Sequence, residues 1–197
     1  RLAKSGHDVT IGSRTPEKAQ ATAAELGDLA YGTNAEIAPD KDILIVTVPY
    51  SAHASTLEEI RAHAANAIVV DTTVPLVPPK VMRVQLPAAG SAALEAKSIL
   101  GPEIRFVTAF HNVAAHILDT DEKVDCDVLV FSDDVEARNS VIALTADMGL
   151  RGLSGGALVN SAAAEALTSI LIYMNKNYAA DGAGIRFTNL TKAPAIP

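Results

Sequence analysis

The stretch that decides the fold is Asp42-Ile43-Leu44-Ile45-Val46-Thr47-Val48-Pro49. Its aliphatic residues follow one another without the polar alternation of a half-exposed strand, so it predicts a strand buried on both faces. A helix is predicted over residues 51–65, and a second strand of the same buried type over residues 67–71. Two buried strands joined by a helix indicate a parallel βαβ unit, because a parallel connection has to cross over the sheet.

The same alternation continues on both sides of this unit. Further strands are predicted at residues 8–12, 29–31, 105–110, 126–131 and 149–153, and helices at residues 15–26, 89–100 and 134–148. This order predicts an α/β protein with a doubly wound, mostly parallel, Rossmann-like sheet. A long apolar helix at residues 160–178 comes last. We therefore predict a Rossmann-like domain over residues 1–153 and a small C-terminal helical segment over residues 154–197.

The composition excludes several classes of protein. The 197 residues carry a net charge of −7 and include no Trp, four Phe and four Tyr, which argues against a nucleic-acid partner. No apolar run approaches the ~20 residues of a membrane span. The single cysteine, Cys126, excludes an internal disulfide and fits a reducing compartment, so we expect a cytoplasmic protein. The histidines and carboxylates show no ligand spacing, and we expect no metal site.

The clearest chemical signal lies at the end of the predicted strand 8–12. Ser13 and Arg14 follow this strand, and Lys18 comes one helical turn later. In a dinucleotide-binding fold this position meets the adenine ribose, where an acid binds NAD and an arginine accommodates the 2′-phosphate of NADP. A hydroxyl and two cations suit a phosphate, although the same residues also fit a plain helix entry. We predict NADP as the cofactor and residues 1–153 as its binding domain.

The first residues carry an expectation about the remainder of this domain. Residues 1–6 have the composition of a helix end, with Gly6 as the stop. The strand and glycine-rich loop that hold the pyrophosphate in such a fold would lie ~20 residues further toward the N-terminus. We therefore expect that residues 1–153 lack the first strand and the glycine loop.

Several short motifs occur along the chain: residues 2–14 (LAKSGHDVTIGSR), 48–50 (VPY), 69–76 (VVDTTVPL), 109–113 (AFHNV), 158–161 (LVNS), 165–168 (EALT) and 184–187 (GIRF). Together they resemble one family, the NADPH-dependent reductases of the deazaflavin coenzyme F420. The likeness runs in the same order over nearly the whole chain, and it implies an oxidoreductase that transfers a hydride reversibly between NADP(H) and F420.

The resemblance also implies a place for each of the two rings. The nicotinamide would lie on Val48-Pro49 and Val74-Pro75, each of which follows a predicted strand. The deazaflavin side would be lined by Asn112 and Val113, with His111 as the catalytic residue. Ligands of open α/β sheets do collect outside the carboxyl ends of the strands. The one proton to be managed, at the deazaflavin ring nitrogen, is left to a backbone N–H, a water or His111.

Two other functions stay open on the sequence alone. The same fold suits an NADP-dependent reductase of a flavin, a ferric ion or a small carbonyl, and also a non-catalytic NADP-binding module. Two further polar residues have open roles as well. His53 follows Pro49 in the region of the predicted site, at even odds of lying near it, and Asp71 either caps nearby N–H groups or contacts a ligand.

The helix predicted at residues 160–178 is apolar on more than one side. At 3.6 residues per turn Ile172 points away from Leu167, Ile170 and Met174, so two surfaces have to be buried. The sheet can cover one of them. We predict that a second copy of the chain covers the other in a homodimer, since twofold dimers are the commonest assemblies.

Overall fold

The structure is a computed structural model that describes residues 1–191. The strands are β1 (Thr10–Ser13), β2 (Ala30–Thr33), β3 (Ile43–Val46), β4 (Ile68–Asp71), β5 (Arg105–Thr108), β6 (Asp127–Phe131) and β7 (Arg151–Gly156). The helices are α1 (Pro16–Glu25), α2 (Asn34–Ile37), α3 (Tyr50–Arg61), α4 (Ala92–Leu100), α5 (Ala115–Leu118), α6 (Val135–Asp147) and α7 (Ser161–Tyr178), with short 3-10 turns at Ala3–Ser5 and Leu158–Asn160.

Five strands form the main sheet in the order β3-β4-β5-β6-β7. Neighbouring strands run parallel except for β5 and β6, which pair antiparallel through Thr108 and Phe131 alone. The doubly wound, mostly parallel sheet is therefore confirmed. The single antiparallel step was not predicted, because the segment between β5 and β6 shows no periodicity that would reveal a change of direction.

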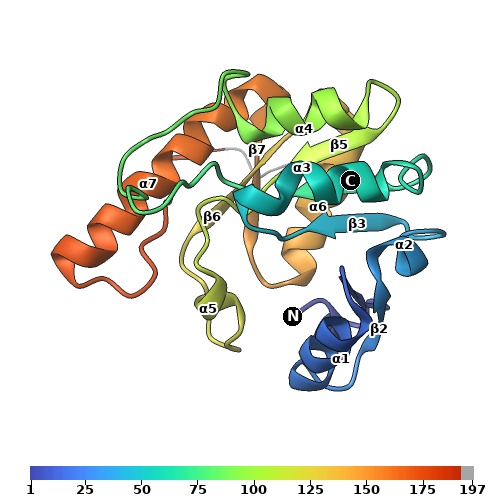
Figure 1. The fold of residues 1–197 in the computed structure, drawn as a ribbon. Coiled ribbons are helices and arrows are strands. Elements are labelled where there is room, and N and C mark those ends of the chain that lie inside the picture. The colour runs from blue at the N-terminus through green and yellow to red at the C-terminus, as the bar shows by residue number, and fades with distance from the viewer. Residues whose placement is uncertain (192–197) are drawn as a thin grey trace.

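Helices cover both faces of this sheet, as continuous apolar strands require. The β4 residues alternate between the two layers. Val69 packs toward α3 and α4 in one core cluster, whereas Ile68 and Val70 pack toward α6 in the other. In Figure 1, α3 and α4 lie one above the other on the near side of the sheet, and α6 lies behind it. Val69 and Val70 are fully buried, so β4 forms the centre of the protein. The prediction that the run 42–49 is buried on both faces was wrong, because β3 is the edge strand of the described sheet and its Ile45 is 38% exposed.

The N-terminal strands form a separate unit. β1 and β2 pair in parallel as a two-stranded sheet with α1 against them, and within residues 1–191 no strand joins β1 to β3. In a Rossmann strand order this place belongs to the strand that carries the glycine-rich loop. Figure 1 shows the unit in blue below the edge of the main sheet that β3 forms.

The short helix α2 packs against β1 and β2, and the sequence did not predict it. Thr33 and Glu36 form a capping box at its start. Its Ile37 lies so close to β1 that a Cβ on Gly12 would come within 2.7 Å of the Ile37 Cδ1 atom. Close packing against Ile37 therefore explains why residue 12 is a glycine. Ser13 and Arg14 follow it, and Arg14 is exposed.

The C-terminal segment is tied back onto the sheet by Asp127, a strand residue that is 1% exposed. Its carboxylate accepts hydrogen bonds from the Arg151 Nε (2.5 Å) and Nη2 (2.7 Å) atoms and from the Phe187 N–H (2.6 Å). The Asp127 N–H donates to the Ile185 carbonyl at 2.7 Å. The chain after α7 thus returns to β6, and the predicted division at residue 153 stays a prediction.

The long helix α7 lies over one end of the sheet, in orange and red in Figure 1. Its covered face includes Ala164 and Leu171. The apolar residues that stay uncovered are Ile170 and Met174, which are 48% and 37% exposed, whereas Ile172 is half-buried. The helix has two apolar surfaces, as predicted. The outer surface carries Ile170 and Met174, and Ile172, which the sequence analysis placed there, does not belong to it. Within the described residues no helix has the length and apolar character to cross a membrane.

Candidate functional site

Three segments leave the main sheet at its carboxyl edge, which is the end where β3, β4 and β5 stop. The last residues of β3, β4 and β5 are direct neighbours, because Val46 pairs with Asp71 and Asp71 pairs with Thr108. Residues 47–49, 72–75 and 109–113 therefore begin side by side. These segments contain Val48-Pro49, Val74-Pro75 and residues 111–113, which the sequence predicted to share one site. Val48, Val74 and Val113 are half-buried and Pro49 is exposed, so these apolar side chains suit the face of a planar ring, whereas Pro75 is buried.

Below this edge the carboxylate of Asp71 is 0% exposed and bound on both oxygens. The His53 Nε2 atom, in the first turn of α3, lies 2.7 Å from Asp71 Oδ2, and the Thr73 N–H donates to Oδ1 at 3.1 Å. His53 is itself 2% exposed. Of the two alternatives for Asp71, the structure shows the capping of an N–H group of its own loop, and it adds a bond to the histidine of the neighbouring helix.

A second set of bonds runs from Asp71 to the segment after β5. The Asp71 carbonyl accepts the Ala109 N–H at 3.1 Å and the Thr108 hydroxyl at 3.0 Å. The Thr108 Oγ1 atom lies 2.6 Å from His111 Nε2. The Asp71 carbonyl, the Thr108 hydroxyl and the His111 ring thus form one continuous chain of hydrogen bonds.

The turn that brings His111 back onto Thr108 is strained. Phe110 has a φ of +67°, a left-handed conformation that bulky side chains rarely adopt. It lies directly between the end of β5 and His111, so the chain reverses there. Strain of this kind is tolerated where surrounding contacts over-determine the backbone, and it concentrates at functional sites.

His111 is neutral at physiological pH. Its ring is 5% exposed, and this burial lowers the pKa of its imidazole to about 4 against the opposing effect of the Asp71 charge. A neutral imidazole lacks the extra proton that a general acid would give away. The structure therefore favours a role for His111 in shaping the site and leaves the proton to a backbone N–H or a water.

The segment after His111 is clamped to α7. The Thr168 hydroxyl donates to the His111 carbonyl at 2.8 Å, and the Asn112 Nδ2 atom donates to the Ala164 carbonyl at 2.9 Å. The Asn112 amide is thus engaged with the helix, and Val113 is the half-buried residue beside it. Helix α7 therefore holds the segment after β5 in place, while its other side lies on the outside of the molecule.

A buried carboxylate to which the sequence analysis gave no role joins α7 to α4. Glu165 is 1% exposed, and its two oxygens accept the Ala92 N–H at 2.7 Å and the Ala93 N–H at 3.1 Å. These are first-turn donors of α4, which have no partner within their own helix. Burial raises the pKa of the Glu165 carboxyl, while the two N–H groups act in the opposite direction. A lone acid in a small-residue helix was the only signal in the sequence.

Replacing Glu165 by alanine should destabilise the protein by about 2–4 kcal/mol, because two buried N–H groups lose their acceptor. Thermal unfolding should show the loss as a fall of roughly 4–16 °C for a chain of this size. The matched control is Glu17→Ala, which removes an exposed acid from the first turn of α1 and should change the melting temperature by far less. An unchanged melting temperature in the Glu165 variant would show that the cap contributes little.

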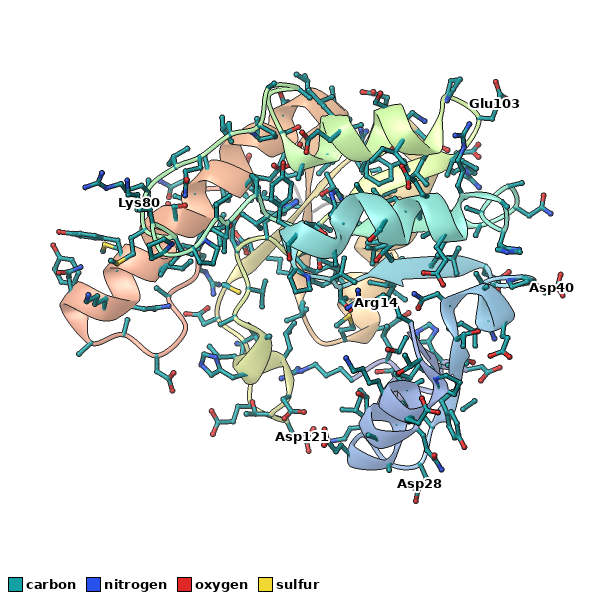
Figure 2. The ribbon with its side chains drawn as sticks, viewed as in Figure 1. Arg14, Asp28, Asp40, Lys80, Glu103 and Asp121 are labelled. Atoms are coloured by element: carbon teal, nitrogen blue, oxygen red, sulfur yellow. The ribbon has the colours of Figure 1, made fainter. Side chains whose placement is uncertain are left out.

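The residues predicted to bind the 2′-phosphate lie apart from this edge, on the N-terminal unit. Ser13 ends β1 and is half-buried, while Arg14 and Lys18 are exposed. Figure 2 shows Arg14 on the side of the blue unit that faces the main sheet. Within residues 1–191 neither cation lies within ion-pair distance of a carboxylate. The donor set, two cations and a hydroxyl, fits a phosphate group.

Comparison with known proteins identifies the family. A family described as NADP oxidoreductase, coenzyme F420-dependent, matches residues 1–75. The F420-dependent NADP reductase of Methanocaldococcus jannaschii is 36% identical over 96% of this chain and 91% of its own length. The chain belongs to the F420-dependent NADP reductase family. The reductase of Methanothermobacter thermautotrophicus agrees, with 34% identity over 96% of the chain and 88% of its own length.

A solved structure shares the fold. A protein of Arthrobacter sp. FB24, proposed there to be an F420-dependent NADP reductase, superimposes with a TM-score of 0.79 over 95% of this chain and 91% of that one, at 21% identity. The agreement over 95% of the chain shows that the two proteins share their fold.

The structure brings together most of the predicted site of this reductase family member. Val48, Pro49, Val74, Pro75 and the residues after β5 lie at one sheet edge. Ser13, Arg14 and Lys18 lie on the separate β1–β2 unit. Thr108 was missed as a polar partner, because a threonine inside a buried strand resembles a core residue until its neighbour is known.

Proposed function

We propose that this protein is an oxidoreductase that transfers a hydride reversibly between NADP(H) and coenzyme F420. The observation that carries the proposal is the identity of 36% with a reductase of that name over 96% of the chain. Its support in the structure is the apolar edge above β3, β4 and β5, where the reactive rings of two carriers would meet. NADPH, when bound, supplies the hydride, so the protein has to supply binding, orientation and exclusion of water.

Each predicted residue has a proposed task in this reaction. Ser13, Arg14 and Lys18 would bind the 2′-phosphate, and Val48-Pro49 with Val74-Pro75 would hold one face of the nicotinamide. The segment after β5 would line the deazaflavin side, with Val113 against the ring and Asn112 fixing the segment to α7. His111 would orient the ring at this position as a neutral imidazole. Residues 1–153 would form the NADP-binding domain and residues 154–197 the C-terminal cover.

A mixing assay tests the function directly. NADPH is added to the full-length protein with F420, and loss of NADPH absorbance together with bleaching of the deazaflavin is the expected result. Turnover with a flavin or a ferric salt but not with F420 would replace the proposed acceptor. Binding of NADPH without turnover of any acceptor would make the protein a non-catalytic NADP-binding module.

We also propose that the reductase works in the cytoplasm as a homodimer. The support for the dimer is the outer face of α7, which carries the exposed apolar side chains of Ile170, Tyr173 and Met174. A second copy would cover this face, and a twofold arrangement would place the same face of both copies in contact. The support for the compartment is the single, buried and unpaired Cys126.

Replacing Ile170 by lysine should therefore convert dimer to monomer. A charge placed in the middle of an apolar interface has to be desolvated, so sedimentation should show the apparent mass falling about twofold. The matched control is Leu26→Lys, which adds a lysine at a similarly exposed apolar position far from α7 (50% against 48% exposed) and should leave the mass unchanged. A parent protein that already sediments as a monomer would contradict the dimer.

A further inference from the structure

One residue below the sheet edge is bonded to all three segments of the proposed site, to two through its side chain and to the third through its backbone carbonyl. Asp71 holds the α3 start through His53, its own loop through Thr73, and the segment after β5 through its carbonyl. Of the acids in the described residues, only Asp71 is 0% exposed. It contacts no proposed ligand position itself, so any part that it plays in the reaction has to be exerted through these bonds.

The two sides of Asp71 act on different segments. The carboxylate fixes the entrance of α3, which follows Val48-Pro49, and the turn that leads to Val74-Pro75. The carbonyl holds Thr108, and through it the ring of His111 at 2.6 Å. The distance between a hydride donor and its acceptor depends on how these three segments lie relative to one another. A misplacement of about 1 Å in such a geometry costs on the order of a hundredfold in rate.

We propose that Asp71 is a positioning residue of the hydride-transfer site, whose carboxylate aligns the two nicotinamide-bearing segments through His53 and the Thr73 N–H, while its backbone carbonyl holds the deazaflavin-bearing segment through Thr108. This inference rests on the proposed function. It makes the alignment of residues 47–53 with residues 72–76 a property of one buried carboxylate, and it assigns His53 the part of a fixed partner that never meets the substrate.

The first test uses hydrogen exchange on the protein without ligand. In Asp71→Asn the side chain keeps one acceptor oxygen, so when this oxygen accepts the Thr73 N–H an NH2 group faces His53, which loses its charged acceptor. Backbone amides in residues 47–53 and 72–76 should exchange about tenfold faster, both together, whereas residues 109–114, which the backbone carbonyl of residue 71 holds, should change less. The control is Asp127→Asn, an equally buried strand aspartate that binds Arg151 and the C-terminal segment; it should speed exchange there and spare the three site segments.

The second test separates positioning from mere stability. Asp71→Asn should lower kcat by roughly 10- to 100-fold while NADPH binding changes less than about threefold, and the deuterium isotope effect from labelled NADPH should rise. His53→Phe should behave in the same way, whereas His53→Gln, which keeps an N–H donor for Asp71, should recover most of the rate. Asp127→Asn should leave the isotope effect unchanged even where it lowers the melting temperature.

The outcomes are distinguishable from one another. If the parent protein oxidises NADPH with F420 and Asp71→Asn matches it in kcat and isotope effect, the positioning role is wrong. If exchange rises only in residues 72–76, the coupling of this loop to the start of α3 is wrong. If the parent protein shows no turnover with F420, the proposed function fails, and the exchange experiment still decides whether the Asp71 carboxylate ties these two segments together.

Discussion

Replacing Arg14 by alanine should weaken NADPH binding by roughly ten- to a hundredfold and leave NADH binding nearly unchanged. A charge-assisted hydrogen bond to a phosphate contributes about 1.5–3 kcal/mol, and each 1.4 kcal/mol is a factor of ten in affinity. NADH lacks the 2′-phosphate, so it loses nothing when the guanidinium is removed. The guanidinium is free for this task, because it is exposed and has no acidic partner within the described residues.

The measurement is a titration of both cofactors against the full-length protein, the variant and a control. Arg61→Ala removes an exposed arginine from the last turn of α3, at the opposite end of that helix from Pro49, and should change neither affinity. Equal losses of NADPH and NADH in the Arg14 variant would mean that Arg14 does not read the 2′-phosphate. Lys18 would then be the next cation to test.

Acid should destabilise the protein through His111, and removal of this histidine should abolish that part of the loss. Burial lowers the pKa of His111 to about 4, whereas an unfolded histidine has its ordinary value near 6.5. Between these values the unfolded chain takes up a proton that the folded protein refuses, so stability falls as the pH falls. The loss between pH 7.5 and pH 5 should be about 2 kcal/mol for this group.

Denaturant unfolding at the two pH values checks the effect. His111→Gln should be less stable than the parent protein at pH 7.5, yet it should lose about 2 kcal/mol less on acidification. His63→Gln, at the far end of α3, controls for the removal of a histidine elsewhere. The same pH dependence in the parent protein and in the His111 variant would show that the imidazole titrates as it does in the unfolded chain.

Much of the fold follows from patterns that are local in the sequence. The run from Ile68 to Val70 lacks polar residues, and this is enough to place β4 inside the protein with helices on both faces. The same pattern in β3 was wrong about burial on both faces, because β3 lies at the edge of the described sheet and Ile45 is 38% exposed. Thr15 and Pro16 predicted the start of α1 to the residue, since Thr at the N-cap and Pro at the first position are local requirements of a helix. The short helices α2 and α5 were missed because four residues carry no detectable period.

The sequence predicted the residues of the site from the order of strands along the chain. It did not predict which side chains contact one another. Residues that follow buried parallel strands meet at one sheet edge, so the sequence alone is enough to group Val48, Val74 and Val113. The polar frame beneath them could not be predicted. His53 and Asp71 lie 18 residues apart, Glu165 and Ala92 lie 73 apart, and nothing in the intervening sequence indicates either bond.

By itself the sequence determined the class of fold, the family and the residues that follow each strand, because hydrophobic periodicity, helix caps and short motifs all act over a few neighbouring positions. Only the tertiary structure decided that His111 is neutral, that Asn112 faces α7, and that Asp71 is bonded to three segments at once. Each of these depends on burial and on partners brought close by the sheet. Desolvation and hydrogen bonding act through space, and a linear pattern does not record which distant groups will come to lie within about 3 Å of one another.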